Sequence, residues 1–287
     1  MKLVRFGVPG EERPGVIDGN GRLRDLSGHV EDIASHALSD ENLRRLAALD
    51  AASLPLVPAD VRIGPCVGRV GKMICVGLNY SDHAAESNMA VPTEPVLFMK
   101  ATSAIVGAHD EVEIPPGAEK VDWEVELGVV IGREARYVSR EHALEYVAGY
   151  CVVNDVSERA YQLERGGQWD KGKGCDTFGP LGPWLVTRDE IPDPQSLRLW
   201  LEVDGKRYQD GSTRTMIFDV ATLVSYISQF MSLQPGDVIS TGTPPGVGLG
   251  QKPEPVFLRV GQTMRLGIDG LGEQQQRTVA ARIPEAR

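Results

Sequence analysis

Acidic residues line one side of the apolar segment VDWEVELGVV, residues 121–130. Its odd-numbered positions are apolar, and Asp122, Glu124 and Glu126 fill even-numbered ones. Side chains two positions apart on a strand share a face, so Glu124 and Glu126 lie about 7 Å apart at the backbone and can converge. Like charges on one strand face repel each other. The face is therefore either open to water or occupied by a hard cation, which two carboxylates and a third oxygen ligand would suit.

A third acid follows the next apolar segment, residues 148–153. Asp155 stands where that expected strand ends, either as a side chain that faces a cleft or as the N-cap of the next helix. A helix that starts at Asp155 would bring Arg159 and Gln162 onto the same face with it. Three acids, a guanidinium and an amide would then point into one region.

A histidine and a glutamate three positions apart form a candidate general base. In GLNYSDHAAESN, His83 and Glu86 would touch each other if the segment is helical. A carboxylate that orients and polarises an imidazole suits it to remove a proton from water. His29, His36 and His142 are expected to lack such a partner.

Two glycine-rich segments offer further polar groups. KGKGCDTFGPLGPW, residues 171–184, places lysines in an expected loop with little side-chain bulk, where a lysine is ordinarily solvated. STGTPPGVG, residues 240–248, is expected to be a turn after a strand. It lacks the G-K-[ST] ending of a phosphate-binding P-loop, but its backbone N–H groups and Thr243 could face an anion.

The elements that must position these residues are mostly short strands separated by the 32 Gly and 19 Pro residues of the chain. Strands in KLVRFG, PGVID and RLRDL, with a hairpin turn at DGNG, precede a helix capped by Ser39 or Asp40. These elements predict a small N-terminal α/β domain, residues 1–68, followed by a catalytic domain, residues 69–287.

One further helix is expected in FDVATLVSYISQFM behind an Asp219 cap. Its apolar stripe is predicted to be core: Val220, Leu223, Val224, Ile227, Phe230 and Met231. The fold class is thus α+β and mostly β.

Composition excludes several classes of function. A net charge of −10 over 287 residues disfavours nucleic acid as a partner. No segment approaches the roughly 20 apolar residues of a membrane span. The start lacks the apolar region of a secretory signal, so a cytoplasmic location is expected. Four scattered cysteines without a C-x-x-C pair are expected to be reduced and mostly buried.

Five motifs in order resemble the catalytic domain of the fumarylacetoacetate hydrolase family: GLNYSDHAAE, EVE, NDVSERAYQ, KGKGCDTFGPLGP and GDVISTGTPPGVG. The resemblance covers roughly residues 70–280. It implies a mixed β-roll fold and a homodimer. The short N-terminal region is similar to bacterial members of about this length, often labelled ureidoglycolate lyase or hydroxymuconate isomerase, which include hydrolases of 2,4-diketo-3-deoxy sugar acids.

The resemblance also implies a metal site. A divalent cation, commonly Mg²⁺ with Mn²⁺ or another divalent ion as an alternative, would be held by carboxylates matching Glu124, Glu126 and Asp155. Lys173, by its place before DTFGP, matches the lysine near the metal, rather than Lys171.

Substrate and water contacts are implied in the same way. Arg159, Gln162 and Thr243 match positions that contact substrate in the family. His83 and Glu86 match a water-activating pair in members that have a mobile lid over the site.

These parts suit C–C bond hydrolysis of a small anionic 2-oxo acid. A hard cation held by three carboxylates leaves about half of its coordination shell for water and a 2-oxo carboxylate. When the bond beyond C3 breaks, the pyruvate fragment leaves as an enolate, whose charge the cation and Lys173 can stabilise. His83 would deprotonate the water that attacks C4. The expected enzyme is an Mg-dependent hydrolase of a 2,4-diketo acid, either an acylpyruvate or a 2,4-diketo-3-deoxy sugar acid.

Other activities stay open. The same stabilisation of an enolate by the cation and Lys173 would support an isomerase or decarboxylase of an unsaturated 2-hydroxy or 2-oxo diacid. Neither of these reactions needs an attacking water. A ureidoglycolate lyase would break a C–N bond and needs no enolate. A non-enzymatic alternative is a metal-stabilised scaffold that binds a small acid. The substrate beyond C4 is left undetermined.

Overall fold

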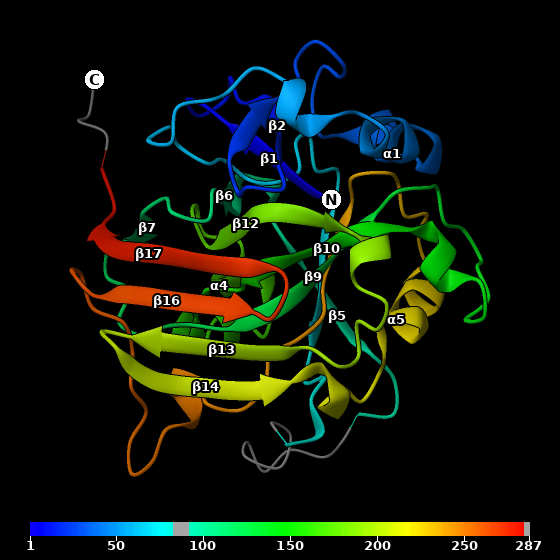
Figure 1. The fold of residues 1–287 in the computed structure, drawn as a ribbon. Coiled ribbons are helices and arrows are strands. Elements are labelled where there is room, and N and C mark those ends of the chain that lie inside the picture. Colours follow the sequence, from blue (N-terminus) through cyan, green and yellow to red (C-terminus); the bar gives the residue numbers. More distant parts are fainter. Residues whose placement is uncertain (83–91, 284–287) are drawn as a thin grey trace.

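The computed structural model describes residues 1–82 and 92–283. Within these ranges the chain forms short strands, few helices and three sheets (Figure 1). The strands are β1 (Lys2–Phe6), β2 (Arg13–Ile17), β3 (Leu23–Asp25), β4 (Met73–Gly77), β5 (Val96–Lys100), β6 (Ile105–Val106), β7 (Val112–Ile114), β8 (Val121–Asp122), β9 (Val125–Ile131), β10 (Val147–Asn154), β11 (Ser157–Glu158), β12 (Gly179–Thr187), β13 (Arg198–Val203), β14 (Lys206–Ser212), β15 (Val238–Ser240), β16 (Thr263–Ile268) and β17 (Gly272–Ala280).

The α-helices are α1 (Asp40–Ala47), α3 (Arg159–Leu163), α4 (Asp170–Lys173) and α5 (Val220–Ile227). Short 3₁₀ helices span Ser35–Leu38, Ala51–Ser53, Thr102–Ala104, Ala143–Tyr146, Arg188–Glu190, Thr213–Thr215 and Gly248–Gly250. The expected fold class, mostly β with mixed sheets, is confirmed.

The largest sheet has ten strands and runs through both halves of the chain. Its order is β3-β2-β1-β12-β10-β9-β15-β4-β5, with β6 beside β12. The N-terminal strands and their hairpin form as predicted, and Gly21 N donates to Asp18 O at 2.9 Å. They join the sheet where β1 pairs with β12. The domain boundary near residue 68 stays a prediction.

A second sheet of five strands, in the order β14-β13-β16-β17-β7, lies in front of β9 and β10 in Figure 1. Alternate side chains of β10 serve two cores, as the two-residue period of a strand requires. Tyr150 and Val152 belong to the core that includes β13 and β16, whereas Cys151 and Val153 belong to the core that includes β1 and α1. Strand β10 is therefore buried on both faces.

The segment predicted as one strand, residues 121–130, is interrupted at residues 123–124. The prediction of a continuous strand is wrong because side-chain oxygens accept the bonds of successive backbone N–H groups. Trp123 N donates to Asp122 Oδ1, Glu124 N to Asn154 Oδ1 and Val125 N to Gln209 Oε1, at 2.8, 3.3 and 3.0 Å. The odd-numbered apolar positions still share one core across the break.

The helix predicted after Ser39 and the helix predicted after Asp219 both form with the expected caps. Ser39 accepts from Asn42 N before α1, and Asp219 accepts from Thr222 N before α5. Four residues of the predicted α5 stripe are buried. Phe230 is 63% exposed because the helix ends at Ile227, so its assignment to the core is wrong.

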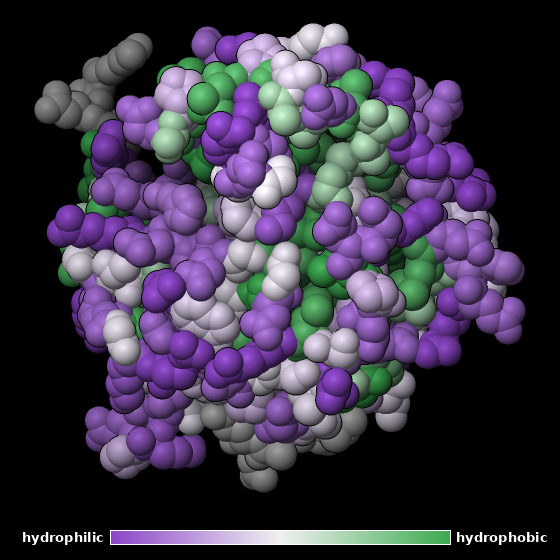
Figure 2. Space-filling model, viewed as in Figure 1, coloured by the Kyte–Doolittle hydropathy of each residue, from purple (hydrophilic) through white to green (hydrophobic). Residues whose placement is uncertain are grey.

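The cysteines are free thiols, as expected: Cys66, Cys75 and Cys151 are buried and Cys175 is partly buried. None of the helices in residues 1–82 and 92–283 has the length and apolar character needed to cross a membrane. Figure 2 shows a face that is mostly hydrophilic, with apolar residues in smaller patches.

Candidate active site

Three carboxylates converge beside the ten-stranded sheet. Glu124 precedes β9, Glu126 lies in β9, and Asp155 follows the neighbouring β10. One oxygen from each lies within 4.8 Å of the others, and all three side chains are buried. These side chains therefore do not lie on a freely solvated strand face.

Asp155 does not cap a helix. Its backbone N–H donates to Glu124 O at 2.9 Å, so the pairing of the two chain segments continues past the end of β10. Helix α3 begins only at Arg159 and is capped by Glu158, whose carboxylate accepts from Tyr161 N at 2.6 Å. The predicted helix start at Asp155 is wrong, and the Asp155 carboxylate is directed to the acidic cluster instead.

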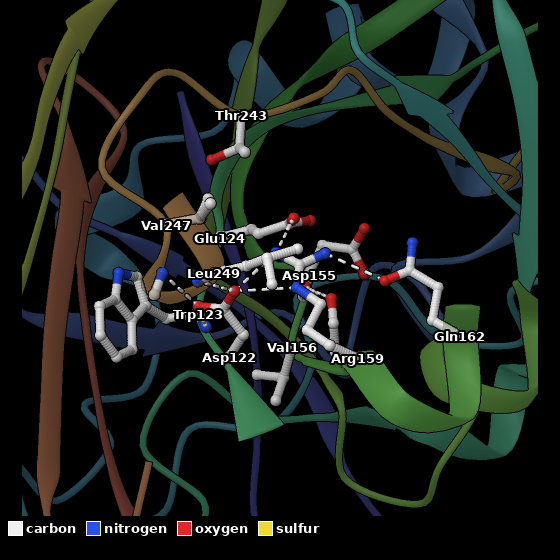
Figure 3. A network of polar contacts seen from close by, with 12 residues as sticks. Asp122, Trp123, Glu124, Asp155, Val156, Arg159, Gln162, Thr243, Val247 and Leu249 are labelled. Carbon is white, nitrogen blue, oxygen red and sulfur yellow. Dashed lines mark hydrogen bonds and ion pairs between the residues drawn. The ribbon is translucent and has the colours of Figure 1, made fainter. Parts of the chain in front are cut away.

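Arg159 and Gln162 lie on one face of α3, three residues apart. Arg159 Nη1 donates to Gln162 Oε1 at 3.1 Å and Nη2 donates to Glu124 Oε1 at 2.6 Å (Figure 3). Arg159 Nε donates to Asp122 Oδ2 at 2.8 Å. The guanidinium thus fixes one carboxylate of the cluster, while a substrate contact of Arg159 or Gln162 stays a prediction.

Asp122 joins the site in a way the sequence did not assign. Its fully buried carboxylate accepts from Arg159 and also from Gly248 N and Leu249 N, at 2.6 and 2.9 Å. Its place on the acidic face of segment 121–130 was the available signal. Its partners come from distant segments, which the sequence does not reveal.

Lys173 lies in the short helix α4, not in a loop as expected. Its Nζ donates to Glu124 Oε2 at 2.6 Å and to Asp155 Oδ2 at 2.8 Å. The same Nζ lies 5.1 Å from the centroid of the Phe98 ring. Lys171, in contrast, is exposed. Of these two lysines, the structure therefore brings Lys173 to the carboxylates.

A second buried lysine, Lys100, was missed by the sequence analysis. It ends β5, and its Nζ donates to Asp155 Oδ1 at 2.5 Å and to Val156 O at 2.9 Å. A lysine that ends the apolar strand VLFMK was the only signal in the sequence. Two ammonium groups thus flank Asp155.

Burial and charge act in opposite directions on the two glutamates. Burial disfavours the charged form of Glu124, but the nearby charges of Lys173 and Arg159 outweigh this and lower its pKa. Burial raises the pKa of Glu126 well above its usual 4.5, and the charges of Asp155 and Glu124 raise it further. The surroundings of Glu126 therefore favour its protonated form more than those of Glu124 do.

The segment 240–248 supports Glu126 directly. Ser240 Oγ and Gly242 N both donate to Glu126 Oε2, at 2.6 and 2.9 Å. Thr243 Oγ1 donates to Val125 O and accepts from Gln209 Nε2, both at 2.8 Å. A backbone N–H of this turn does face an anion, but that anion is a carboxylate of the chain itself.

A cavity of about 310 Å³ opens over these groups. Its volume is at the lower end of the range for small-molecule sites. Polar residues expected from the sequence line it: Glu124, Glu126, Arg159, Gln162, Lys173 and Thr243. The site can thus place a small molecule against a concentrated set of charges.

The proposed base lies outside the described residues. His83 and Glu86 fall within residues 83–91, so their relation to the cavity stays a prediction. The expectation that His142 lacks an acidic partner is wrong. His142 Nδ1 lies 3.0 Å from Glu145 Oε1, and both side chains are exposed.

The donor set fits a hard divalent cation. Carboxylate oxygens are the ligands that such ions prefer, and three of them lie within 4.8 Å of one another. Both donors to Glu126 use Oε2, so that within the described residues Oε1 receives no hydrogen bond. Oε1 is therefore available as a ligand.

Comparison with known proteins gives the same assignment as the motifs. Residues 72–279 match the family model described as "Fumarylacetoacetate (FAA) hydrolase C-terminal". The chain belongs to the fumarylacetoacetate hydrolase family. A curated relative from Burkholderia ambifaria, named "Putative hydrolase", is 68% identical over 282 residues, covering 98% of this chain and 100% of the relative.

Solved structures of this family are similar over nearly the whole chain. A fumarylacetoacetate hydrolase from Exiguobacterium antarcticum has a TM-score of 0.86 and 38% identity, covering 98% of this chain and all of that one. A maleylpyruvate hydrolase from Sphingobium sp. SYK-6, in complex with manganese(II) and pyruvate, has a TM-score of 0.81 and 31% identity with the same coverage. A 5-carboxymethyl-2-hydroxymuconate delta-isomerase from Mycobacterium smegmatis has a TM-score of 0.75 and 33% identity, covering 99% and 100%.

Proposed function

We propose that this protein is a divalent-metal-dependent hydrolase that cleaves a C–C bond of a 2,4-diketo acid, giving pyruvate and a carboxylic acid. The observation that supports it most is that three buried carboxylates meet Lys173, and that Glu124, Glu126 and Lys173 line a small-molecule cavity. The similarity to a maleylpyruvate hydrolase that was solved with manganese(II) and pyruvate supports the same reaction class.

Glu124, Glu126 and Asp155 would hold the cation, which we propose to be Mg²⁺, with Mn²⁺ or another divalent ion able to replace it. Bound there, the cation would supply positive charge to the oxygens of a 2-oxo carboxylate and stabilise negative charge that develops on them. Cation binding would also displace the proton that the raised pKa of Glu126 favours.

Lys173 supplies a second positive charge at the same place. Its ammonium is held by Glu124 and Asp155, so it is oriented before substrate binds. In this position it would stabilise the negative charge on the pyruvate fragment as the C3–C4 bond breaks. Arg159 and Thr243 line the cavity, where they would help to orient the substrate.

Hydrolysis also needs a base, and His83 with Glu86 is proposed for that role. Their spacing in HAAE suits a helix-borne pair in which the carboxylate orients the imidazole. His83 would remove a proton from the water that attacks C4, and would return it to the departing pyruvate fragment at C3. This activation of water distinguishes the proposed hydrolase from an isomerase or a decarboxylase, which use no attacking water.

An isomerase of an unsaturated 2-hydroxy diacid is the second candidate, because an isomerase structure is similar over nearly the whole chain. Tautomerisation uses the same charges and no attacking water. Decarboxylation, ureidoglycolate lysis and simple binding of a small acid stay alternatives that rest on the sequence alone. A homodimer and a cytoplasmic location are parts of the proposal that rest on the sequence alone.

A pyruvate-release assay tests the function. Purified protein would be offered acylpyruvates and 2,4-diketo-3-deoxy acids with Mg²⁺, and again with excess chelator. Release of pyruvate and an equimolar carboxylic acid, abolished by the chelator, is expected. Conversion of an unsaturated 2-hydroxy diacid to its 2-oxo tautomer without pyruvate release would replace the hydrolase with the isomerase.

A further inference from the structure

The cavity has two chemically different parts. Five of its charged or amide side chains are almost completely buried and form a polar floor: Glu124, Glu126, Arg159, Gln162 and Lys173. The remaining described lining is apolar apart from glycines, Thr243 and Lys252, and includes Phe98, Leu163, Trp169, Val247 and Leu249. A ligand whose anionic end lies on the floor would direct its other end towards this apolar wall.

Two leucines of the wall are unusually exposed for large apolar side chains. Leu163 is 47% exposed and Leu249 is 39% exposed, and both line the cavity. Apolar side chains that stay exposed beside a polar site commonly mark the surface that a ligand covers. Burial of an alkyl group against them would remove apolar area from water.

Both leucines have fixed positions relative to the polar floor, one through a hydrogen bond and the other through its place in a helix. Leu249 N donates to Asp122, the same carboxylate that accepts from Arg159. Leu163 follows Gln162 in α3. Figure 3 shows Leu249 beside Asp122. Both leucines are therefore placed relative to the charged groups before a ligand arrives.

Trp169 is a further apolar residue of the wall. Its ring lies 5.3 Å from that of Phe98, centroid to centroid, in a tilted arrangement. Gly77 also lines the cavity, and a Cβ added there would lie only 2.5 Å from the Trp169 ring. The indole therefore occupies the space that any larger residue at position 77 would need. This close packing holds the ring in place.

We propose that the site selects 2,4-diketo acids whose tail beyond C4 is apolar, and that Leu163, Leu249 and Trp169 determine this selectivity. The inference rests on the proposed function, because it places the 2-oxo carboxylate on the polar floor. The rival is a diacid whose distal carboxylate pairs with Lys252 at the cavity edge. That lysine is exposed and hydrated, so it offers little attraction, and the distal carboxylate would lose water among apolar atoms.

Three substrates test the inference by pyruvate release: acetylpyruvate, 2,4-dioxooctanoate, and 2,4-dioxooctanedioate, which matches the second in length but ends in a carboxylate. We expect kcat/KM for 2,4-dioxooctanoate to exceed that of each of the other two at least tenfold, since each buried methylene contributes about fourfold. The ratio of kcat/KM for 2,4-dioxooctanoate to kcat/KM for acetylpyruvate is the readout for the variants.

Leu249→Ser should lower that ratio about fivefold. The substitution keeps the backbone hydrogen bond from residue 249 to Asp122. Leu144→Ser is the matched control, because Leu144 is 40% exposed and lies outside the cavity lining. The ratio should not change in the control. A preference for the diacid that Lys252→Gln abolishes, or equal activity with all three substrates, would overturn the inference and leave the hydrolase intact. If none of the three substrates releases pyruvate, both the proposed function and this inference are contradicted.

Discussion

Lys100 and Asp155 form an ion pair in which neither side chain is exposed to solvent. Lys100 Nζ lies 2.5 Å from Asp155 Oδ1, and Lys173 Nζ lies 2.8 Å from the other oxygen, Oδ2. The carboxylate is therefore held from two sides by ammonium groups from β5 and α4. The pair also joins the edge strand β5 to the segment after β10, in the middle of the same sheet.

Lys100→Met should lower the free energy of unfolding by about 3 kcal/mol, because it removes one of the two ammonium partners of the buried Asp155 carboxylate. Lys173 remains to share the charge of Asp155, which keeps the loss at the low end of the usual range. Urea denaturation followed by tryptophan fluorescence, with excess chelator, measures the change.

The control for this substitution is Lys171→Met. Lys171 is exposed, so its replacement should change stability by no more than about 0.5 kcal/mol. If the two variants unfold at the same urea concentration, the buried pair does not stabilise the fold as argued.

Glu126→Gln should remove divalent-cation binding and leave the fold intact. The amide oxygen can still accept from Ser240 and Gly242, while the second carboxylate oxygen, the proposed ligand, becomes an N–H₂ group. Isothermal titration with Mn²⁺ measures binding, and circular dichroism checks the fold. Glu164→Gln, at an exposed glutamate, should bind Mn²⁺ like the unmodified protein. Binding that survives Glu126→Gln would exclude this glutamate as a ligand.

Local spacing was enough to predict much of the fold and of the carboxylate cluster. The alternation in segment 121–130 placed Glu124 and Glu126 on one face, and the end of an apolar strand indicated Asp155. The interruption of that strand depends on side chains of Asn154 and Gln209, which approach from other strands. Contacts of this kind have no local signal in the sequence.

Lys100 was missed for the same reason. A lysine at the end of a strand is usually solvated, and only the packing of β5 against the site buries it. The start of α3 was misplaced because Asp155 is a favoured N-cap residue and Glu158 is not, whereas pairing of β11 with β8 keeps residues 157–158 extended until Arg159. Tertiary contacts therefore fix what local preference leaves open.

Asp18 should make stability depend on pH in the acid range. A backbone hydrogen bond from Arg22 and a side-chain bond from Arg24 lower the pKa of Asp18 from 3.8 to about 2, although burial opposes the shift. Because the folded-state pKa is the lower one, this stabilisation is complete above the unfolded value and is lost as pH falls towards 2. Asp18→Asn should therefore lower Tm at about pH 6 and much less at about pH 2.

Thermal unfolding at the two pH values measures that difference. Asp60→Asn, at an exposed aspartate, is the control and should leave Tm unchanged at both. An equal Tm loss for Asp18→Asn at both pH values would show that the carboxylate's charge is not the source of the effect.

His83→Ala separates the hydrolase from the isomerase. If His83 activates water, its loss should lower hydrolysis of a 2,4-diketo acid by about 10²–10⁴-fold, the range for removal of a general base. Mn²⁺ affinity should stay the same, because the imidazole is not a proposed ligand. His142→Ala is a matched control, since His142 also has a glutamate three residues on, yet lies exposed and outside the cavity lining.

Lys173→Met should slow a wider set of reactions than His83→Ala. Comparison of the two variants therefore tests the two proposed roles separately. Lys173 contacts two of the three proposed metal ligands, so its loss should slow every reaction that develops negative charge on the 2-oxo acid, including decarboxylation of oxaloacetate. His83→Ala should spare that decarboxylation, because no water attacks a carbon atom in it. Steady-state rates for both reactions in both variants give the test. Equal losses in the two reactions for His83→Ala would exclude a water-specific role for His83, and unchanged hydrolysis would leave the hydrolase without its proposed base.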